Sequence, residues 1–290
     1  MMVEVGADPS SWSGVSVSVV IPARNAAAHL PDLLPLIPER MHEVILVDDA
    51  STDDTVAVAR RLRPGIRVIE TAGPGEPSAA RDEADAPDAP DAGWQGKATA
   101  LQTGFAAATG EIIVTFDADG SADPREIPRF VGHLLAGADY AKGSRYLQGG
   151  VPAPMPWHWQ ARNAAFVRLV RLLFGGRFSD LGYGYNAFWR RMLPALRLDG
   201  DGPEIEAIMN IRALQVGLKV VEVPSSEASP RHPAGEDPAP VRLPPGWGML
   251  KTIWRERRPG RPGMPLRFTP PQTPSPYAAP APKAGSGASG

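Results

Sequence analysis

Short β-branched runs alternate with helix-length segments along residues 15–257, and this alternation restricts the folds open to the chain. β-branched side chains favour strands, and short apolar runs bounded by turn residues are typical of buried strands. Six such runs predict strands over residues 15–21, 43–48, 66–70, 111–116, 140–144 and 218–223. Strands that alternate with helices form mostly parallel sheets covered on both faces. The sequence therefore predicts an α/β fold with a Rossmann-like sheet flanked by helices.

The segments between these runs carry helix signals. Helices are predicted over residues 27–37, 53–62, 96–108, 123–135, 162–174, 204–216 and 247–257. Ser51 resembles an N-cap for the second helix, with Asp54 in its first turn. Asp123 followed by Pro124 is typical of a helix start. Pro31 and Pro35 limit the regularity of the first helix.

The composition predicts one domain with flexible ends. The chain has 290 residues, of which 43% are hydrophobic and 21% charged, as expected for a globular domain with a sizeable core. We expect a flexible N-terminus over 1–14, one domain over 15–258 and a disordered tail over 259–290, where proline is frequent and little apolar surface can be buried. Residues 71–93 are rich in Ala, Pro and Asp and predict a surface insertion.

Charge and cysteine content exclude several classes of function. The net charge of −2 gives no general attraction to nucleic acid. The absence of cysteine excludes disulfides, thiolate metal sites and a cysteine nucleophile. The N-terminus lacks a signal-peptide pattern and no apolar run has the length of a membrane helix. We expect a cytoplasmic protein, at most peripheral to the inner face of the membrane.

Acidic residues follow two of the predicted strands. Asp48 and Asp49 end the strand over 43–48, and Asp117 and Asp119 follow the strand over 111–116. Ligands of open parallel sheets bind outside the carboxyl ends of the strands. Two carboxylates one residue apart can hold a divalent cation together with ligand phosphates, although Asp is also common in ordinary turns. No glycine-rich dinucleotide fingerprint and no phosphate-binding loop is present.

An ordered series of segments resembles the family 2 glycosyltransferases with the GT-A fold. These segments are 19–25 (VVIPARN), 47–55 (VDDASTDDT), 96–101 (GKATAL), 108–111 (ATGE) and 116–120 (FDADG). Later segments are similar to the branch that transfers sugars to dolichol or polyprenol phosphate, in a bacterial form: 142–146 (KGSRY), 180–186 (DLGYGYN), 204–206 (EIE) and 222–224 (EVP). The resemblance spans about residues 15–257. It implies an inverting transfer of one hexose from a nucleotide-diphospho-sugar, of the GDP-mannose or UDP-glucose class, with Mg²⁺ or Mn²⁺ as cofactor and polyprenyl phosphate as acceptor.

The resemblance also implies roles for individual residues. Three residues match positions that hold the nucleotide base and ribose: Pro22, Val47 and Asp49. Asp117 and Asp119 match the pair that binds the metal and the diphosphate, and the backbone of Ala118 matches a contact with the nucleotide. Three basic residues match or lie near positions that face the donor phosphates: Lys97, Arg145 and Arg231. The residues nominated for catalysis are Asp119, Arg145 and Glu206.

The need for a general base depends on the acceptor. A lipid phosphate is already an anion and needs cationic partners, for which Arg145 and Arg231 are candidates. A hydroxyl acceptor needs a carboxylate base, and the candidates are Glu204, Glu206 and Asp180, with Glu206 favoured. A capped helix start and a structural hydrogen bond remain the alternative reading of these carboxylates.

Other functions stay open. Ala26 stands where the family usually has glutamate, and the loop that begins at Arg231 departs from the family pattern. These departures leave open a nucleotide-sugar-binding protein with little turnover, a transferase with a soluble or glycan acceptor, and, more remotely, a nucleotidyltransferase. Basic and apolar residues of the last predicted helix, among them Lys251, Trp254 and Arg255, favour a contact with an anionic membrane surface, or packing on the domain.

Overall fold

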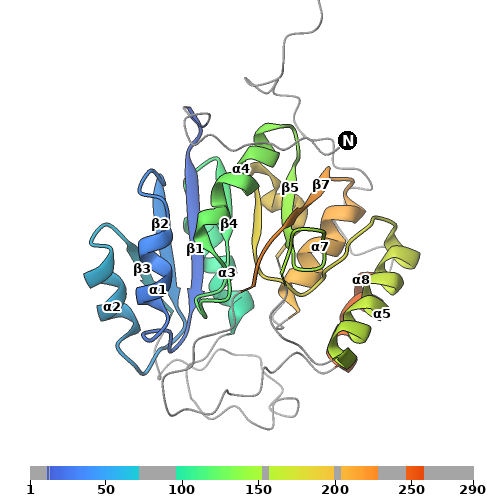
Figure 1. Cartoon of the computed structure of the whole chain (residues 1–290), viewed down its shortest axis with the longest axis horizontal. Coiled ribbons are helices and arrows are strands. Elements are labelled where there is room, and N and C mark those ends of the chain that lie inside the picture. The colour runs from blue at the N-terminus through green and yellow to red at the C-terminus, as the bar shows by residue number, and fades with distance from the viewer. Residues whose placement is uncertain are drawn as a thin grey trace, which may run out of the picture.

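Seven short strands form one sheet at the centre of the molecule (Figure 1). The structure is a computed structural model, and it describes residues 12, 14–71, 96–151, 157–198, 204–227 and 246–257. The strands are β1 (Val17–Ala23), β2 (Glu43–Asp48), β3 (Arg67–Glu70), β4 (Ile112–Thr115), β5 (Tyr140–Ser144), β6 (Asn186–Trp189) and β7 (Val220–Pro224). Their order is β3-β2-β1-β4-β6-β5-β7. Strand β6 runs antiparallel to β4 and β5, and the other neighbouring pairs are parallel.

Helices follow most of the strands. The α-helices are α1 (Leu30–Leu33), α2 (Thr55–Leu62), α3 (Lys97–Ala107), α4 (Ile127–Leu135), α5 (Trp157–Phe174), α6 (Leu193–Leu196), α7 (Ile205–Gln215) and α8 (Gly246–Glu256). Short 3₁₀ helices are η2 (Leu34–Leu36), η4 (Pro124–Glu126) and η5 (Arg190–Met192). None of the helices in the described ranges is long and apolar enough to cross a membrane.

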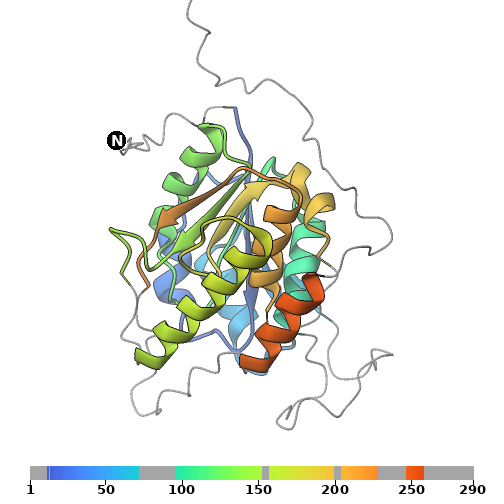
Figure 2. The same ribbon diagram turned by 90° about the vertical axis from the view of Figure 1, so that its right-hand side faces the viewer.

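The sheet has an apolar core on each face. Side chains of a strand point alternately to its two faces, so Val19 and Ile21 of β1 pack with α1, α2 and α4, whereas Val20 packs with α3, α6 and α7. A third cluster joins α5, α7 and α8, and Figure 2 shows α5 and α8 side by side beyond the β7 end of the sheet. The predicted α/β fold with helices on both faces of a mostly parallel sheet is confirmed.

Several local predictions were wrong in detail. The helix predicted over 27–37 is a four-residue α-helix followed by η2, since Pro31 and Pro35 remove backbone donors. Helix α2 begins at Thr55, not at residue 53, with Asp54 as its N-cap, and Ser51 accepts a hydrogen bond from the Asn25 amide instead.

The later half differs as well. Strand β6 and helix α6 were not predicted, and α5 begins five residues earlier than expected. Asp123 does cap a helix start, accepting a hydrogen bond from the Arg125 amide, but that first turn is the 3₁₀ helix η4. The tail over 259–290, most of the 71–93 insertion and all of the 1–14 segment except residues 12 and 14 lie outside the described residues.

Candidate active site

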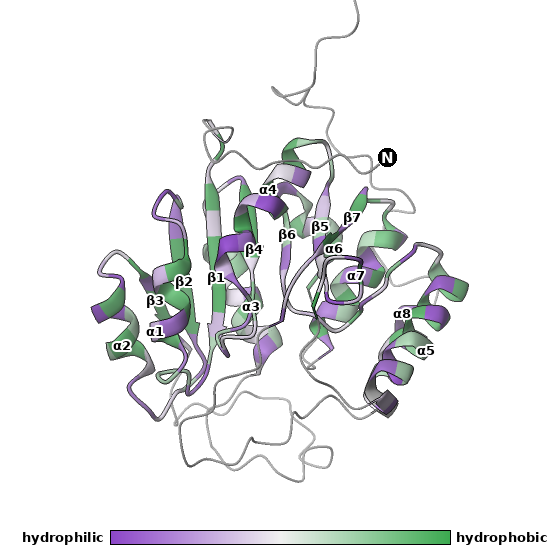
Figure 3. Ribbon diagram, in the orientation of Figure 1, coloured by the Kyte–Doolittle hydropathy of each residue, from purple (hydrophilic) through white to green (hydrophobic). Residues whose placement is uncertain are grey.

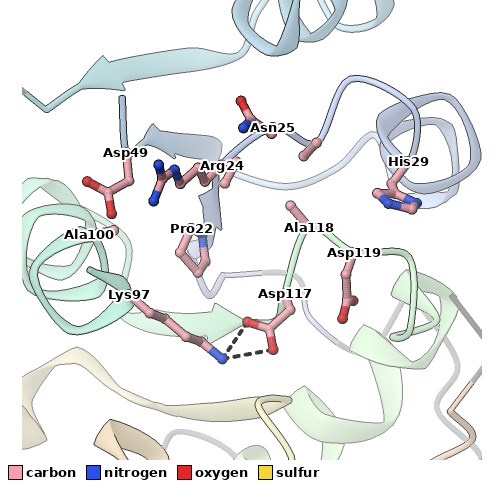
Figure 4. A pocket seen from close by; sticks show the side chains of 12 residues that line it. Pro22, Arg24, Asn25, His29, Asp49, Lys97, Ala100, Asp117, Ala118 and Asp119 are labelled. Atoms are coloured by element: carbon pink, nitrogen blue, oxygen red, sulfur yellow. Dashed lines mark hydrogen bonds and ion pairs between the residues drawn. The ribbon is translucent and has the colours of Figure 1, made fainter. Parts of the chain in front are cut away.

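A pocket of about 390 Å³ opens where β1, β2 and β4 end (Figure 4). Its walls come from the loops after these three strands and from the start of α3. The lining residues are Pro22, Ala23, Arg24, Asn25, Ala26, His29, Asp49, Lys97, Ala100, Asp117, Ala118 and Asp119. Six residues that the sequence nominated thus meet in one pocket: Pro22, Asp49, Lys97, Asp117, Ala118 and Asp119.

Hydrogen bonds join the loops after β1 and β2. The Asn25 amide donates to Ser51 Oγ at 2.9 Å, and Asn25 Oδ1 accepts from the Thr52 amide at 2.8 Å. The Ala26 amide donates to Thr55 Oγ1 at 2.8 Å. Asn25 adopts a left-handed conformation with φ of 48°, which asparagine tolerates better than most residues. This wall of the pocket is therefore fixed by contacts between the two loops.

Asp49 ties the pocket to both ends of the 72–95 segment. Its Oδ2 accepts a hydrogen bond from the Gly96 amide at 2.8 Å, and its Oδ1 accepts from Thr71 Oγ1 at 3.1 Å. The residue is 3% exposed. Gly96 is the N-cap residue of α3 and has a positive φ of 90°, a conformation that suits glycine. Asp49 thereby positions the start of α3, and its contact with a nucleotide stays a prediction.

Asp117 and Asp119 lie in the loop that follows β4. Asp119 Oδ1 accepts a hydrogen bond from the Ser121 amide at 2.9 Å, which orients its carboxylate. The pKa of Asp119 is raised above its ordinary value, first by the loss of surrounding water and second by the negative charge of Asp117. A bound cation would offset both effects, so this pair of carboxylates favours a positive ligand.

Lys97 supplies a positive charge on the floor of the pocket. Its Nζ lies 2.6 Å from Asp117 Oδ1 and 2.8 Å from Asp117 Oδ2, and it forms a second ion pair with Glu206 of α7. Burial alone lowers the pKa of an ammonium, but the negative charges of Asp117 and Glu206 outweigh this effect and raise the pKa of Lys97. Figure 4 shows Lys97 reaching from α3 toward Asp117.

Gly184 is a site residue that the sequence reasoning did not single out. A Cβ atom at this position would lie 2.8 Å from Asp117 Oδ2 and 3.3 Å from Lys97 Nζ. Only glycine allows the chain before β6 to pass so close to this ion pair. The signal in the sequence was the segment 180–186 (DLGYGYN), but nothing in the segment alone says which glycine matters. The pocket-lining residues Arg24, Asn25 and His29 were also not nominated.

Arg145 lies in a separate network and does not line the pocket. Its Nε donates to Asp180 Oδ2 at 2.7 Å, its Nη2 to Asp180 Oδ1 at 3.1 Å and its Nη1 to Glu227 Oε1 at 2.9 Å. Its guanidinium also lies over the ring of Tyr183, 5.1 Å from the centroid. The side chain is 12% exposed and that of Asp180 is fully buried. A contact between Arg145 and donor phosphates stays a prediction.

Val47, Glu204 and Glu206 do not line the pocket. Val47 is fully buried in the core beneath α3, so its side chain does not line the pocket. Glu204 and Glu206 are mostly buried at the start of α7, and burial raises the pKa of Glu204. Arg231 lies outside the described residues. The roles given to these four residues stay predictions.

Asp117 and Asp119 can supply part of the ligand set of a divalent cation. Carboxylate oxygens are ligands that Mg²⁺ and Mn²⁺ accept. Within the described residues, no group of three or more His, Cys, Asp or Glu is arranged to hold a metal. Mg²⁺ is commonly held by one or two carboxylates together with substrate phosphates. The residues therefore fit a cation whose other ligands come from a bound diphosphate.

The sequence matches a known family over most of the domain. Residues 18–84 and 91–194 match the family described as "Glycosyl transferase family 2". Polyprenol monophosphomannose synthase of Mycolicibacterium smegmatis is 32% identical over 219 residues, which make up 71% of this chain and 75% of that protein. Undecaprenyl-phosphate mannosyltransferase of Micrococcus luteus is 28% identical over 216 residues, 72% of this chain and 82% of that protein.

Solved structures share the fold. Glucosyl-3-phosphoglycerate synthase from Mycobacterium tuberculosis, in complex with Mn²⁺, UDP and glucosyl-3-phosphoglycerate, aligns with a TM-score of 0.60 at 24% identity, over 85% of this chain and 81% of that one. The fold is GT-A, as the sequence predicted. Because the family match covers more than half of the 290 residues and the M. smegmatis relative extends over 71% of them, this chain belongs to glycosyl transferase family 2.

Proposed function

We propose that this family 2 glycosyltransferase moves one hexose from a nucleotide-diphospho-sugar to polyprenyl phosphate, with inversion at the anomeric carbon. The observation that carries the proposal is the pocket where Asp49, Lys97, Asp117 and Asp119 meet at the carboxyl ends of parallel strands. Relatives named for polyprenol and undecaprenyl phosphate support the acceptor. The donor is of the GDP-mannose or UDP-glucose class.

In this proposal the pocket recognises the donor by its charge. Asp117 and Asp119 would hold Mg²⁺ or Mn²⁺, which when bound would neutralise negative charge on the departing nucleoside diphosphate. Lys97, whose side chain is 30% exposed, lies beside these carboxylates and contributes a further positive charge on the pocket floor. The loops joined through Asn25 and Asp49 border the space for the nucleoside.

The acceptor phosphate is the nucleophile. Its oxygen forms a bond to the anomeric carbon from the face opposite the diphosphate, while the bond from that carbon to the diphosphate oxygen breaks. A phosphate oxygen is already anionic, so no protein base has to remove a proton. This suits the site, because within the described part of the pocket lining the only carboxylates are Asp49, which is hydrogen-bonded to Gly96 and Thr71, and the candidate metal ligands Asp117 and Asp119.

A lipid acceptor makes contact with a membrane surface useful, and α5 and α8 offer a suitable face. Among the side chains of these two helices that the structure describes, four large apolar ones are exposed: Trp157 at 79%, Leu172 at 81%, Leu250 at 38% and Trp254 at 58%. Helix α5 contains no acidic residue, and Glu256, the one acidic residue of α8, is buried. Figure 3 shows hydrophobic and hydrophilic residues mixed along α5.

The charges beside these apolar groups have the sign that anionic lipids require. Arg168 and Arg171 of α5 are exposed, and so are Lys251 and Arg255 of α8 and the following Arg257. Exposed apolar side chains among cations are typical of helices that lie at a lipid interface. We name this surface the α5–α8 face and place the peripheral membrane contact there.

The decisive experiment is release of nucleoside diphosphate by the purified full chain. GDP-mannose or UDP-glucose is supplied with Mn²⁺, with or without a short polyprenyl phosphate, to the wild type and to Asp119→Asn. We expect release that requires metal, rises at least tenfold with the lipid and is lost in the variant. The matched control is the variant Glu39→Gln, which should keep wild-type activity. Glu39 is an exposed carboxylate before β2.

Other outcomes separate the alternatives. Release that rises with a soluble phosphorylated or glycan acceptor, and not with the lipid, overturns the lipid acceptor and keeps the transferase. Binding of a donor without any release indicates a nucleotide-sugar-binding protein with little turnover. Release of pyrophosphate indicates a nucleotidyltransferase. No binding of either donor contradicts the proposed site for these donors.

A further inference from the structure

Lys97 holds the carboxylate that the metal would need. Both oxygens of Asp117 lie within 2.8 Å of Lys97 Nζ. A divalent cation on Asp117 would share that carboxylate with an ammonium, and the two positive charges would repel each other at close range. Among the described residues Asp119 forms no ion pair, and its Oδ1 accepts a hydrogen bond from the Ser121 amide. The two candidate ligands therefore differ in how freely they can accept a metal.

Glu206 shares the ammonium with Asp117. It forms an ion pair with Lys97 from the side of the protein interior: its side chain is 7% exposed, against 30% for both Lys97 and Asp117. Glu206 lies in the first turn of α7, a helix packed in the core, so its position is fixed by that packing. The ammonium thus lies between a carboxylate that faces the pocket and one that does not.

The backbone around Lys97 is held in place. Lys97 is the first residue of α3, and the preceding Gly96 is held by its hydrogen bond to Asp49. Gly184 passes over the ion pair, and a Cβ there would lie 3.3 Å from Lys97 Nζ. Because Lys97 is already paired with Glu206, its ammonium can leave Asp117 and keep that partner.

We propose that Lys97 occupies the Asp117 half of the metal site in the donor-free protein, and that Glu206 holds the ammonium aside when the cation and diphosphate bind. Glu206 is then a positioning residue that acts through Lys97, in place of a general base. The inference rests on the proposed function, because it takes Asp117 and Asp119 as the metal ligands. It implies that the protein binds metal weakly alone and strongly with a nucleotide diphosphate.

The test measures Mn²⁺ affinity, by electron paramagnetic resonance of free Mn²⁺, for the full chain without turnover. Without nucleotide, we expect Lys97→Met to bind Mn²⁺ about tenfold more tightly than the wild type, because the competing charge is gone. At saturating UDP or GDP, the gain in Mn²⁺ affinity of Lys97→Met over the wild type falls below about twofold, because the ammonium of the wild type has already left Asp117. Lys219→Met, which removes an exposed lysine on a different part of the surface, is the control and leaves both affinities unchanged.

A double-mutant cycle tests the part played by Glu206. Glu206→Gln weakens Mn²⁺ binding several-fold in the wild type, because the ammonium then stays on Asp117. In the Lys97→Met background the same change has at least a threefold smaller effect, since Glu206 acts through the lysine. Equal effects in both backgrounds overturn the role given to Glu206. Thermal melting checks that each variant is folded, and Lys97→Gln replaces Lys97→Met if the latter is not.

The controls separate this inference from the proposed function. If Asp119→Asn abolishes Mn²⁺ binding in the presence of nucleotide, but Lys97→Met and Lys97→Gln do not tighten binding in its absence, then only the competition by Lys97 is overturned. If Mn²⁺ binding to the wild type does not depend on Asp119, then the proposed metal site fails, and the inference fails with it.

Discussion

At the residue scale, Gly184 leaves no room for a side chain beside Asp117. We expect Gly184→Ala to lower the rate of nucleoside-diphosphate release at least tenfold, because the added Cβ, 2.8 Å from Asp117 Oδ2, displaces that carboxylate. The melting temperature should fall little, since the site is partly open. Gly182→Ala is the matched control, because a Cβ there meets nothing within 4 Å. If Gly184→Ala releases nucleoside diphosphate at the wild-type rate, then the function of Asp117 tolerates this displacement.

The sequence could predict the residues of the pocket, but not the partners that hold them. Asp49 and Asp117 lie at or just after strand ends, and parallel strands bring such residues to one edge of a sheet, so their meeting follows from local patterns. The pairing of Lys97 with Glu206 and of Arg145 with Asp180 joins segments that are far apart in the chain. Those pairs depend on how α7 and the segment before β6 pack, which no local period encodes.

At the scale of elements, α3 lies close to β1 and β2 because Gly104 has no side chain. A Cβ at this position would overlap Val20 Cγ1 and lie 3.0 Å from Val47 Cγ2. We expect Gly104→Ala to lower the free energy of unfolding by about 1–3 kcal/mol, the usual cost of overpacking a core. Denaturant unfolding measures it, with Gly65→Ala, where a Cβ meets nothing within 4 Å, as control. A more stable Gly104→Ala protein would mean that α3 can move away from the sheet freely.

Glu43 joins β2 to β1 and to the turn before β4. It accepts hydrogen bonds from Ser18 Oγ at 2.6 Å and from the amide and hydroxyl of Thr109, both at 2.7 Å. Burial opposes its ionisation, but the hydrogen bonds from Ser18 and Thr109 outweigh burial and lower the pKa of Glu43 from 4.5 to about 2. Because the folded-state pKa is the lower one, the stabilisation is complete above pH 4.5 and is lost as the pH falls from 4.5 to about 2.

Glu43→Gln tests this linkage. We expect the variant to lose roughly 1 kcal/mol of unfolding free energy at pH 7, less than fully buried charged hydrogen bonds contribute, because solvent screens this site. Its stability should also depend less on pH between 4.5 and 3 than that of the wild type. Urea unfolding at several pH values measures both effects. Parallel pH dependence of the two proteins would contradict the lowered pKa.

The elements themselves differed in how well the sequence predicted them. Strands β1 and β2 consist mostly of β-branched and other apolar residues, and their prediction was confirmed to within two residues. Strand β6 is four residues long, follows a segment rich in Gly and Tyr, and pairs antiparallel with β4 and β5. A run so short has no measurable period, and its strand conformation comes from the two neighbours that supply its hydrogen bonds.

At the scale of the whole molecule, α8 is fixed to the domain by a buried ion pair. Arg212 of α7 donates from Nε and Nη2 to Glu256 of α8, at 3.0 and 2.9 Å. Met249 and Ile253 of α8 pack into the cluster shared with α5 and α7. Helix α8 is therefore held in place on the folded domain, next to α5 (Figure 2).

The membrane contact proposed for the α5–α8 face depends on both helices together. We expect Trp254→Ser and Trp157→Ser each to lower the fraction of protein that sediments with vesicles containing anionic phospholipid several-fold, because each removes an exposed aromatic group from the α5–α8 face. Leu36→Ser, on η2, a different element, is the matched control and should sediment like the wild type. Added salt should release the wild type, since Arg168, Arg171 and Lys251 supply the attraction. If the protein sediments equally well with vesicles of neutral lipid alone, the basic residues do not drive the attachment. If neither Trp variant sediments less than the wild type, the membrane contact lies elsewhere on the molecule.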